Sequence, residues 1–110
     1  LTSLDNKSLK EIGFNKDVKK LVFDQARLAL KANLDAIVCS PQEIKIVKKV
    51  FKKEIITPGI RLPGDMKGDQ KRIMSPRKAF QSGATSLVMG RSLTKGNIKK
   101  NIQKLIKELN

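Results

Sequence analysis

Two arginines follow apolar runs at positions where they could bind an anion together. Arg61 comes shortly after the apolar run 55–57, and Arg91 comes after the run 86–89 and Gly90. Arginine offers a planar fork of N–H donors that suits a phosphate, and a glycine lets backbone N–H groups approach the same ligand. Spacing alone leaves two alternatives open, which are a shared phosphate site and a pair of ordinary surface arginines.

Two aspartates between these arginines could form a general acid/base pair. Asp65 and Asp69 lie in a long glycine-containing segment beside Lys67, Lys71 and Arg72. Carboxylates that alternate with cations in a loop are typical of a solvated surface. We therefore expect solvated loop charges here and no catalytic residue.

The sequence contains few of the side chains that usually bind a structural metal or form a catalytic triad. The chain has no histidine and a single cysteine, Cys39, in the apolar run 36–39. A structural zinc site needs several Cys or His ligands, and a Ser-His triad needs a histidine. We expect no metal, and we expect Cys39 to be a buried thiol, which fits a cytoplasmic protein.

The net charge of +14 is the strongest compositional feature. A strongly basic chain suggests nucleic acid or phosphorylated partners. The four aromatic residues are all Phe and do not alternate with the basic runs, as a surface that stacks bases would require. We expect lysine-rich solvated helix faces and no nucleic-acid partner, with a basic nucleic-acid-binding module as the alternative. The lysines lie in every predicted helix, at Lys16, Lys19, Lys20, Lys45, Lys48, Lys49, Lys99, Lys100 and Lys104.

Short apolar runs alternate with amphipathic stretches along the chain, which predicts βα units and a parallel sheet. No apolar run approaches the roughly 20 residues of a membrane helix, so we expect no membrane span. The predicted strands are the strand end 1–4, then 36–39, 55–57 and 86–89. The predicted helices are 16–32 with Asn15 as N-cap, a helix from a Ser40–Glu43 capping box, one from Ser75-Pro76 to Gly83, and a last one carrying Ile98, Ile102, Leu105, Ile106 and Leu109.

Two closed architectures fit this order of elements, a small doubly wound sheet and half of an eight-stranded barrel. Periodicity does not choose between them. In both, the carboxyl ends of the strands face the ligand, so Arg61 and Arg91 are predicted to point into one pocket. The chain also opens on a strand end without an initiator Met, so we expect it to be a piece of a longer protein.

Longer motifs resemble one known family, the orotidine 5'-phosphate decarboxylases. The resemblance covers essentially the whole chain, with the motifs in the family's order. It implies an α/β fold in which residues 1–110 are the second half, the last four βα units, of a (β/α)8 TIM barrel. The motifs are Leu1-Thr2-Ser3-Leu4, Leu34–Ser40, Thr57-Pro58-Gly59-Ile60-Arg61, Gly68–Pro76 and Val88-Met89-Gly90-Arg91-Ser92.

The resemblance also implies a role for particular residues. Gly90 and Arg91 correspond to the site that holds the 5'-phosphate, and Arg61 and Gln70 to a substrate-binding pair at the two ends of a loop. Thr2 corresponds to a position in the substrate pocket, and Ser40 to one near the pyrimidine ring. The substrate-binding residues implied in this way are Thr2, Arg61, Gln70, Gly90 and Arg91.

The family's catalytic lysine, flanked by aspartates, has no counterpart here, because no Asp-x-Lys-x-x-Asp pattern occurs. The resemblance therefore implies a decarboxylase that converts orotidine 5'-monophosphate to uridine 5'-monophosphate without a cofactor, and of which this chain alone is inactive. The implied partners are the substrate, the N-terminal half of the same enzyme and a second copy in a homodimer. A related barrel enzyme acting on a sugar phosphate is a further alternative.

Overall fold

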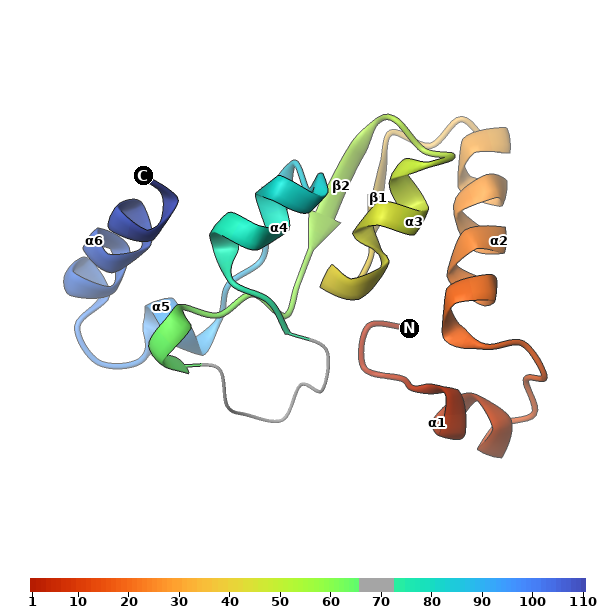
Figure 1. The fold of residues 1–110 in the computed structure, drawn as a ribbon, viewed down its shortest axis with the longest axis horizontal. Helices are drawn as coiled ribbons and strands as arrows, with labels where there is room; N and C mark the ends of the chain where they lie inside the picture. Colours follow the sequence, from red (N-terminus) through yellow and green to blue (C-terminus); the bar gives the residue numbers. More distant parts are fainter. Residues whose placement is uncertain (66–72) are drawn as a thin grey trace.

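The computed structural model of the chain describes residues 1–65 and 73–110. Helices and short strands alternate after two N-terminal helices (Figure 1). The helices are α1 (Asn6–Glu11), α2 (Val18–Lys31), α3 (Ile44–Lys48), α4 (Pro76–Ser82), α5 (Arg91–Thr94) and α6 (Ile98–Leu109). The strands are β1 (Ala36–Val38), β2 (Glu54–Thr57) and β3 (Ser86–Leu87), and the 3-10 turns are η1 (Pro41–Glu43) and η2 (Pro63–Asp65).

The three strands form one parallel sheet in the order β1-β2-β3. Ile37 pairs with Ile55, and Thr57 pairs with Leu87. Each strand is connected to the next through a helix, which is the connection that parallel neighbours require. The α/β class and the parallel sheet predicted from the sequence are confirmed.

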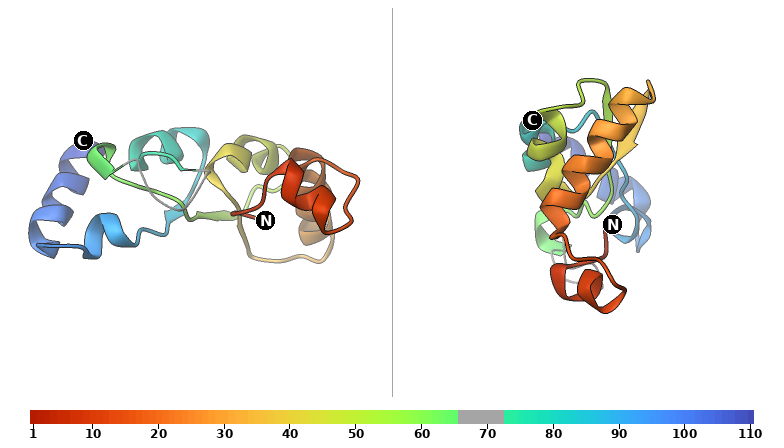
Figure 2. Two further views of the ribbon diagram at one scale, coloured as in Figure 1. Left: turned by 90° about the horizontal axis from the view of Figure 1, so that it is seen from below. Right: turned by 90° about the vertical axis from the view of Figure 1, so that its right-hand side faces the viewer.

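In the part of the chain that the structure describes, the sheet is covered on one face only. Helices α3 and α4 lie on the same side of β2 (Figure 2). Alternate residues of a strand face opposite sides, and Ile55 and Thr57, on one face of β2, are 1% and 0% exposed. On the other side, Val38 and Val88 are 61% and 52% exposed. Helices and strands thus form a two-layer body whose extents are 43 × 31 × 17 Å.

The buried core lies between the helices and the covered face of the sheet. Phe51 is fully buried in it, and the thiol of Cys39 is buried, as the sequence predicted. No helix in the part of the chain that the structure describes is long and apolar enough to cross a membrane. The core residues are Leu9, Val18, Val22, Ala26, Cys39, Ile44, Val47, Phe51, Ile55, Ile60, Ala79 and Ala84.

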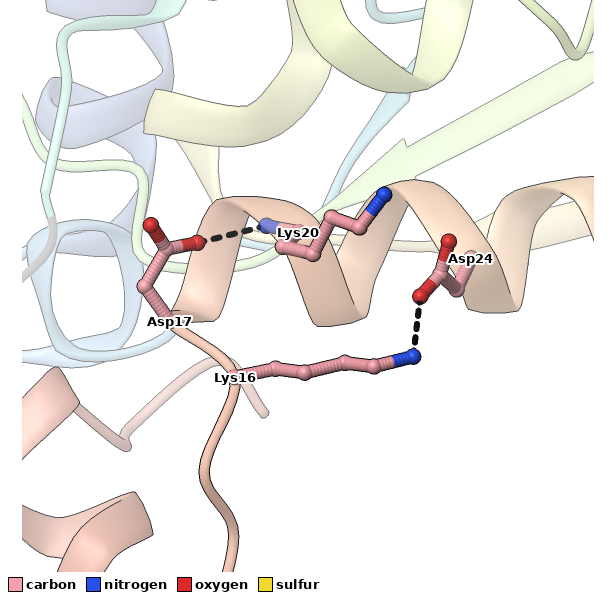
Figure 3. A network of polar contacts seen from close by, with 4 residues as sticks. All are labelled: Lys16, Asp17, Lys20 and Asp24. Atoms are coloured by element: carbon pink, nitrogen blue, oxygen red, sulfur yellow. Dashed lines mark hydrogen bonds and ion pairs between the residues drawn. The ribbon is translucent and has the colours of Figure 1, made fainter.

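The N-terminus of α2 is fixed by polar contacts (Figure 3). The side chain of Asp17 accepts a hydrogen bond from the backbone N–H of Lys20, so Asp17 is the N-cap and the prediction of Asn15 is wrong. Lys16 Nζ lies 2.7 Å from Asp24 Oδ2. This hydrogen bond lowers the pKa of the Asp24 carboxyl. An exposed pair of this kind adds little stability.

The first residues differ from the sequence prediction. Residues 1–4 form a turn in which Leu4 N–H donates to the Leu1 carbonyl at 3.1 Å, and not a strand end. The predicted count of four strands is therefore wrong for the described residues, which contain three. Helix α1 was not predicted, because only Leu9 of its six residues is buried and so the segment has no apolar stripe.

The serine and glycine residues predicted to begin and end helices do so for α4 but only in part for η1. Ser75 caps α4 by accepting from Lys78 N–H, and Gly83 ends that helix with a φ of 120°, both as predicted. Ser40 stands at the N-cap position of η1 but makes no side-chain cap hydrogen bond. Its hydroxyl instead donates to the buried carboxylate of Glu43, so the predicted capping box is not formed.

Helix α6 has the predicted apolar periodicity, but its apolar stripe does not enter the core. None of its residues is buried. Contacts to α4 and α5 hold the helix against the rest of the chain, including a hydrogen bond from Arg77 N–H to Glu108 Oε2 at 3.0 Å. The apolar residues left exposed are Ile98, Ile102, Ile106 and Leu109.

Gly83→Ala tests the left-handed end of α4. An L-residue at a φ of 120° is strained, so we expect a loss of about 1–2 kcal/mol in the free energy of unfolding. The added methyl also meets the Lys48 side chain, which can move because it is exposed. The measurement is thermal unfolding followed by circular dichroism. Gly64→Ala, where an added Cβ meets nothing within 4 Å, is the control, and equal melting temperatures for the two variants would contradict the assignment.

Candidate functional site

The carboxyl ends of β2 and β3 lie side by side because these strands pair in parallel. The chain leaving β2 turns at Gly59, whose φ of 74° favours glycine. It is then held by two hydrogen bonds across the bridge between Ile60 and Met74, from Arg61 N–H to the Met74 carbonyl at 3.0 Å and from Met74 N–H to the Gly59 carbonyl at 3.1 Å. These two hydrogen bonds hold the backbone of residues 59–61 against Met74.

A hollow of about 330 Å³ lies between these two strand ends. Arg61 is 8% exposed at its wall, whereas Arg91 is an exposed residue at the first position of α5. An added Cβ on Gly90 would meet nothing within 4 Å, so the backbone there is open to a ligand. The hollow, called here the strand-end hollow, is lined by Pro58, Gly59, Ile60, Arg61, Val88, Gly90, Arg91 and Ser92.

A buried serine ties the two strand ends together. Ser92 Oγ accepts a hydrogen bond from Leu62 N–H at 3.2 Å, and both residues are buried. This contact joins the segment after β2 to the first turn of α5. It fixes the distance between the backbone at Arg61 and the backbone at Arg91, which a shared ligand would require.

A second hollow of about 350 Å³ lies beside the first and is more cationic. It is called here the outer hollow. Arg61, Arg91 and Ser92 line both hollows. Lys95 and Lys104 line only the outer one, and Asp65 is the one carboxylate in its wall among the described residues. Its remaining lining residues are Gly64 and Asn101.

The structure brings together three of the five site residues that the sequence predicted. Arg61, Gly90 and Arg91 line the strand-end hollow. Thr2 lines a different hollow of about 300 Å³, together with Ser40, next to β1. Gln70 lies outside the described residues.

Sequence reasoning missed Ser92, Lys95 and Lys104 as neighbours of the arginines. The two lysines have no distinguishing signal, because 24 lysines and arginines are spread over the whole chain. Ser92 was noticed only as part of the turn after β3. Its hydrogen bond to Leu62 N–H joins residues 30 apart in the sequence, so only the fold could show it.

The fold and the hollow define a parallel α/β protein with a cationic hollow at the carboxyl ends of adjacent strands. Enzymes of this class bind ligands at that edge of the sheet. The profile of the "Orotidine 5'-phosphate decarboxylase / HUMPS family" matches residues 1–104. The chain belongs to this family.

Curated relatives agree with the family profile. The chain is 49% identical over 96 residues to an orotidine 5'-phosphate decarboxylase of Coxiella burnetii, covering 86% of this chain and 41% of the relative. It is 45% identical over 101 residues to the enzyme of the same name from Prochlorococcus marinus, covering 86% of this chain and 42% of the relative. The chain thus spans well under half the length of the curated relatives that it matches.

Solved structures agree as well. The orotidine 5'-phosphate decarboxylase of Lactobacillus acidophilus superposes on the whole chain with a TM-score of 0.76 at 27% identity, over 46% of its own length. An uncharacterized conserved protein from Geobacillus kaustophilus superposes with a TM-score of 0.72 at 28% identity, also over 46% of its length. The chain therefore has the architecture of about half of such a protein.

Ser92→Ala tests the link between the strand ends. The substitution leaves the buried Leu62 N–H without its acceptor, which costs about 1–3 kcal/mol in the free energy of unfolding. The measurement is urea unfolding. Thr94→Ala is the control, because this exposed hydroxyl donates to the Gly90 carbonyl at 3.3 Å and water can replace it. Equal shifts of the two unfolding midpoints would show that the link is unimportant.

Proposed function

We propose that the strand-end hollow binds the 5'-phosphate of orotidine 5'-monophosphate, in an enzyme that decarboxylates it to uridine 5'-monophosphate. The observation that carries this proposal is the convergence of Arg61, Gly90 and Arg91 on one hollow. Two guanidinium groups provide charge-assisted donors for a phosphate dianion, and the open backbone at Gly90 allows close approach.

The other substrate contacts rest on the family resemblance. We assign Thr2 to the substrate pocket and Gln70 to the phosphate or the pyrimidine. Ser40 stands with Thr2 beside another hollow, which supports a place for the pyrimidine end of the ligand at the carboxyl end of β1. In this arrangement the nucleotide would extend along the carboxyl ends of all three strands.

The role of these residues in the reaction would be to hold the substrate, and not to move a proton. Binding energy from the phosphate, remote from the reacting carbon, lowers the barrier when it is expressed in the transition state. The chain contains no Asp-x-Lys-x-x-Asp pattern, and Asp65 stands among cations in the outer hollow. The lysine that protonates the product carbanion would belong to the other half of the enzyme.

Residues 1–110 would form the C-terminal half of a single (β/α)8 barrel. Three apolar surfaces support this proposal, and the first is the open sheet face with Val38 and Val88. The second is the hollow along β1, lined by all three strand residues and by α2, at an edge of the sheet where no strand pairs among the described residues. The third is the exposed apolar stripe of α6. A closed barrel would cover all three. We also propose that the whole enzyme is a cytoplasmic homodimer.

Mixing this chain with a complementary half should restore a barrel. We expect a one-to-one complex with the part of the Coxiella burnetii relative that this chain does not match, and decarboxylation of orotidine 5'-monophosphate only by the mixture. Sedimentation velocity measures assembly, and formation of uridine 5'-monophosphate measures activity.

Two variants locate the contact surface of that complex. Val38→Asp places a charge on the open sheet face and should prevent assembly, because a buried unpaired charge is very costly. Leu28→Asp is the control, since Leu28 is 64% exposed and lines a separate hollow of α2 with Lys16 and Lys49. Loss of assembly in both variants, or in neither, would contradict the proposed surface.

Arg91→Ala tests the phosphate site itself. Loss of a charge-assisted hydrogen bond of about 1.5–3 kcal/mol should weaken binding of orotidine 5'-monophosphate about 10-fold to 100-fold. Binding of phosphate-free orotidine should hardly change. NMR titration of the chain measures both, and Arg77→Ala, an exposed arginine of α4 that lines neither hollow, is the control. Equal losses for the two ligands would defeat the assignment.

A further inference from the structure

We propose that the outer hollow is a second anion subsite, which takes the second phosphate group of a diphosphate whose first phosphate occupies the strand-end hollow. The ligand class is a pyrophosphate group, either free or carried by a nucleoside diphosphate. This inference extends the proposed function, because it rests on the strand-end hollow as the first phosphate site.

The two hollows are adjacent and share part of their walls. Arg61, Arg91 and Ser92 line both of them. At about 330 and 350 Å³, each is many times larger than the roughly 30 Å³ of one water molecule, and so has room for a phosphate group. Two phosphates joined through one bridging oxygen would therefore lie on either side of the shared arginines.

The outer hollow has cations that a monophosphate in the strand-end hollow would not contact. Lys95 and Lys104 line the outer hollow alone. The ion pair between Lys16 and Asp24 involves neither of these lysines. Asp65 is the one described carboxylate that faces them. Cations in excess around a concave surface favour an anion with more charge than a monophosphate.

A side-chain contact fixes both lysines on the same wall. Asn101 Nδ2 donates to the Leu93 carbonyl at 2.9 Å and to the Lys95 carbonyl at 2.8 Å, which ties the end of α5 to the first turns of α6. Lys95 N–H also donates to the Arg91 carbonyl at 3.0 Å. Lys104 follows Asn101 by three residues on α6, so both project from the same face. The backbone positions of Arg91, Lys95 and Lys104 are thus set relative to one another.

Calorimetric titration of the 110-residue chain with inorganic phosphate and inorganic pyrophosphate tests the subsite. Both hollows lie within this chain, so the other half of the enzyme is not needed. We expect pyrophosphate to bind about tenfold more tightly than phosphate, since each of the two exposed charge contacts adds about threefold. Raising the salt concentration should reduce this preference.

Single substitutions test which lysines cause the preference for pyrophosphate over phosphate. Lys95→Gln and Lys104→Gln should each weaken pyrophosphate about threefold to fivefold and leave phosphate unchanged. Lys99→Gln removes the same charge from an exposed site of α6 outside both hollows, and should change neither ligand. All three sites are exposed, so we expect the variants to fold, which circular dichroism checks.

Several results would overturn the subsite. Equal affinities for phosphate and pyrophosphate would do so. Equal losses of pyrophosphate affinity in Lys99→Gln and Lys104→Gln would also do so, because the overall charge of the chain would then explain the binding. Loss of phosphate binding in Lys95→Gln or Lys104→Gln would place that lysine in the first site and would also contradict the inference.

Uridine 5'-monophosphate and uridine 5'-diphosphate separate this inference from the proposed function. A preference for the diphosphate that Lys104→Gln abolishes supports both, and identifies a nucleotide as the source of the pyrophosphate group. If neither nucleotide binds while pyrophosphate keeps its dependence on Lys95 and Lys104, the subsite stands and the proposed nucleotide function fails.

Discussion

The parallel pairing of β2 with β3 is the constraint on which the candidate site depends. Thr57 pairs with Leu87, so both strands end at the same edge of the sheet and the segments that leave them begin side by side. A slip of one residue in this register would turn the side chains of one strand to the opposite face. The register therefore sets both the packing of Ile55 on the helices and the approach of Arg61 to Arg91.

The same sheet has one face that stays open in the described part of the chain. Helices cover one face, where Phe51 and Ile55 are buried, while Val38 and Val88 remain exposed on the other. A parallel sheet normally has both faces covered. The match to 46% of the length of the Lactobacillus acidophilus structure agrees with this one-sided packing. In the proposed function, ligand contacts and catalytic groups lie on different halves of the family's fold.

The basic charge of the chain is spread over its surface, and only part of this charge lies at the candidate site. The net charge of +14 has no single location, because lysines cover the outer surface of most helices. Only where α5 and α6 meet the segment after β2 do Arg61, Arg91, Lys95 and Lys104 face one hollow. A cluster of this kind acts on a ligand at short range, whereas isolated exposed lysines are screened by salt.

The sequence by itself determined the α/β class, the helix from Ser75-Pro76 to Gly83, and the position of Arg61, Gly90 and Arg91 after strands, because these depend on local periodicity, capping and turn chemistry. It was wrong about Asn15 and about a strand at 1–4, because several polar residues compete as caps and because a strand needs a neighbour to pair with. Only the tertiary structure decided that Ser92 joins the two strand ends, that Lys95 and Lys104 stand beside the arginines, and that Thr2 lines another hollow. Those facts depend on contacts between residues far apart in the chain, and such contacts leave no local pattern.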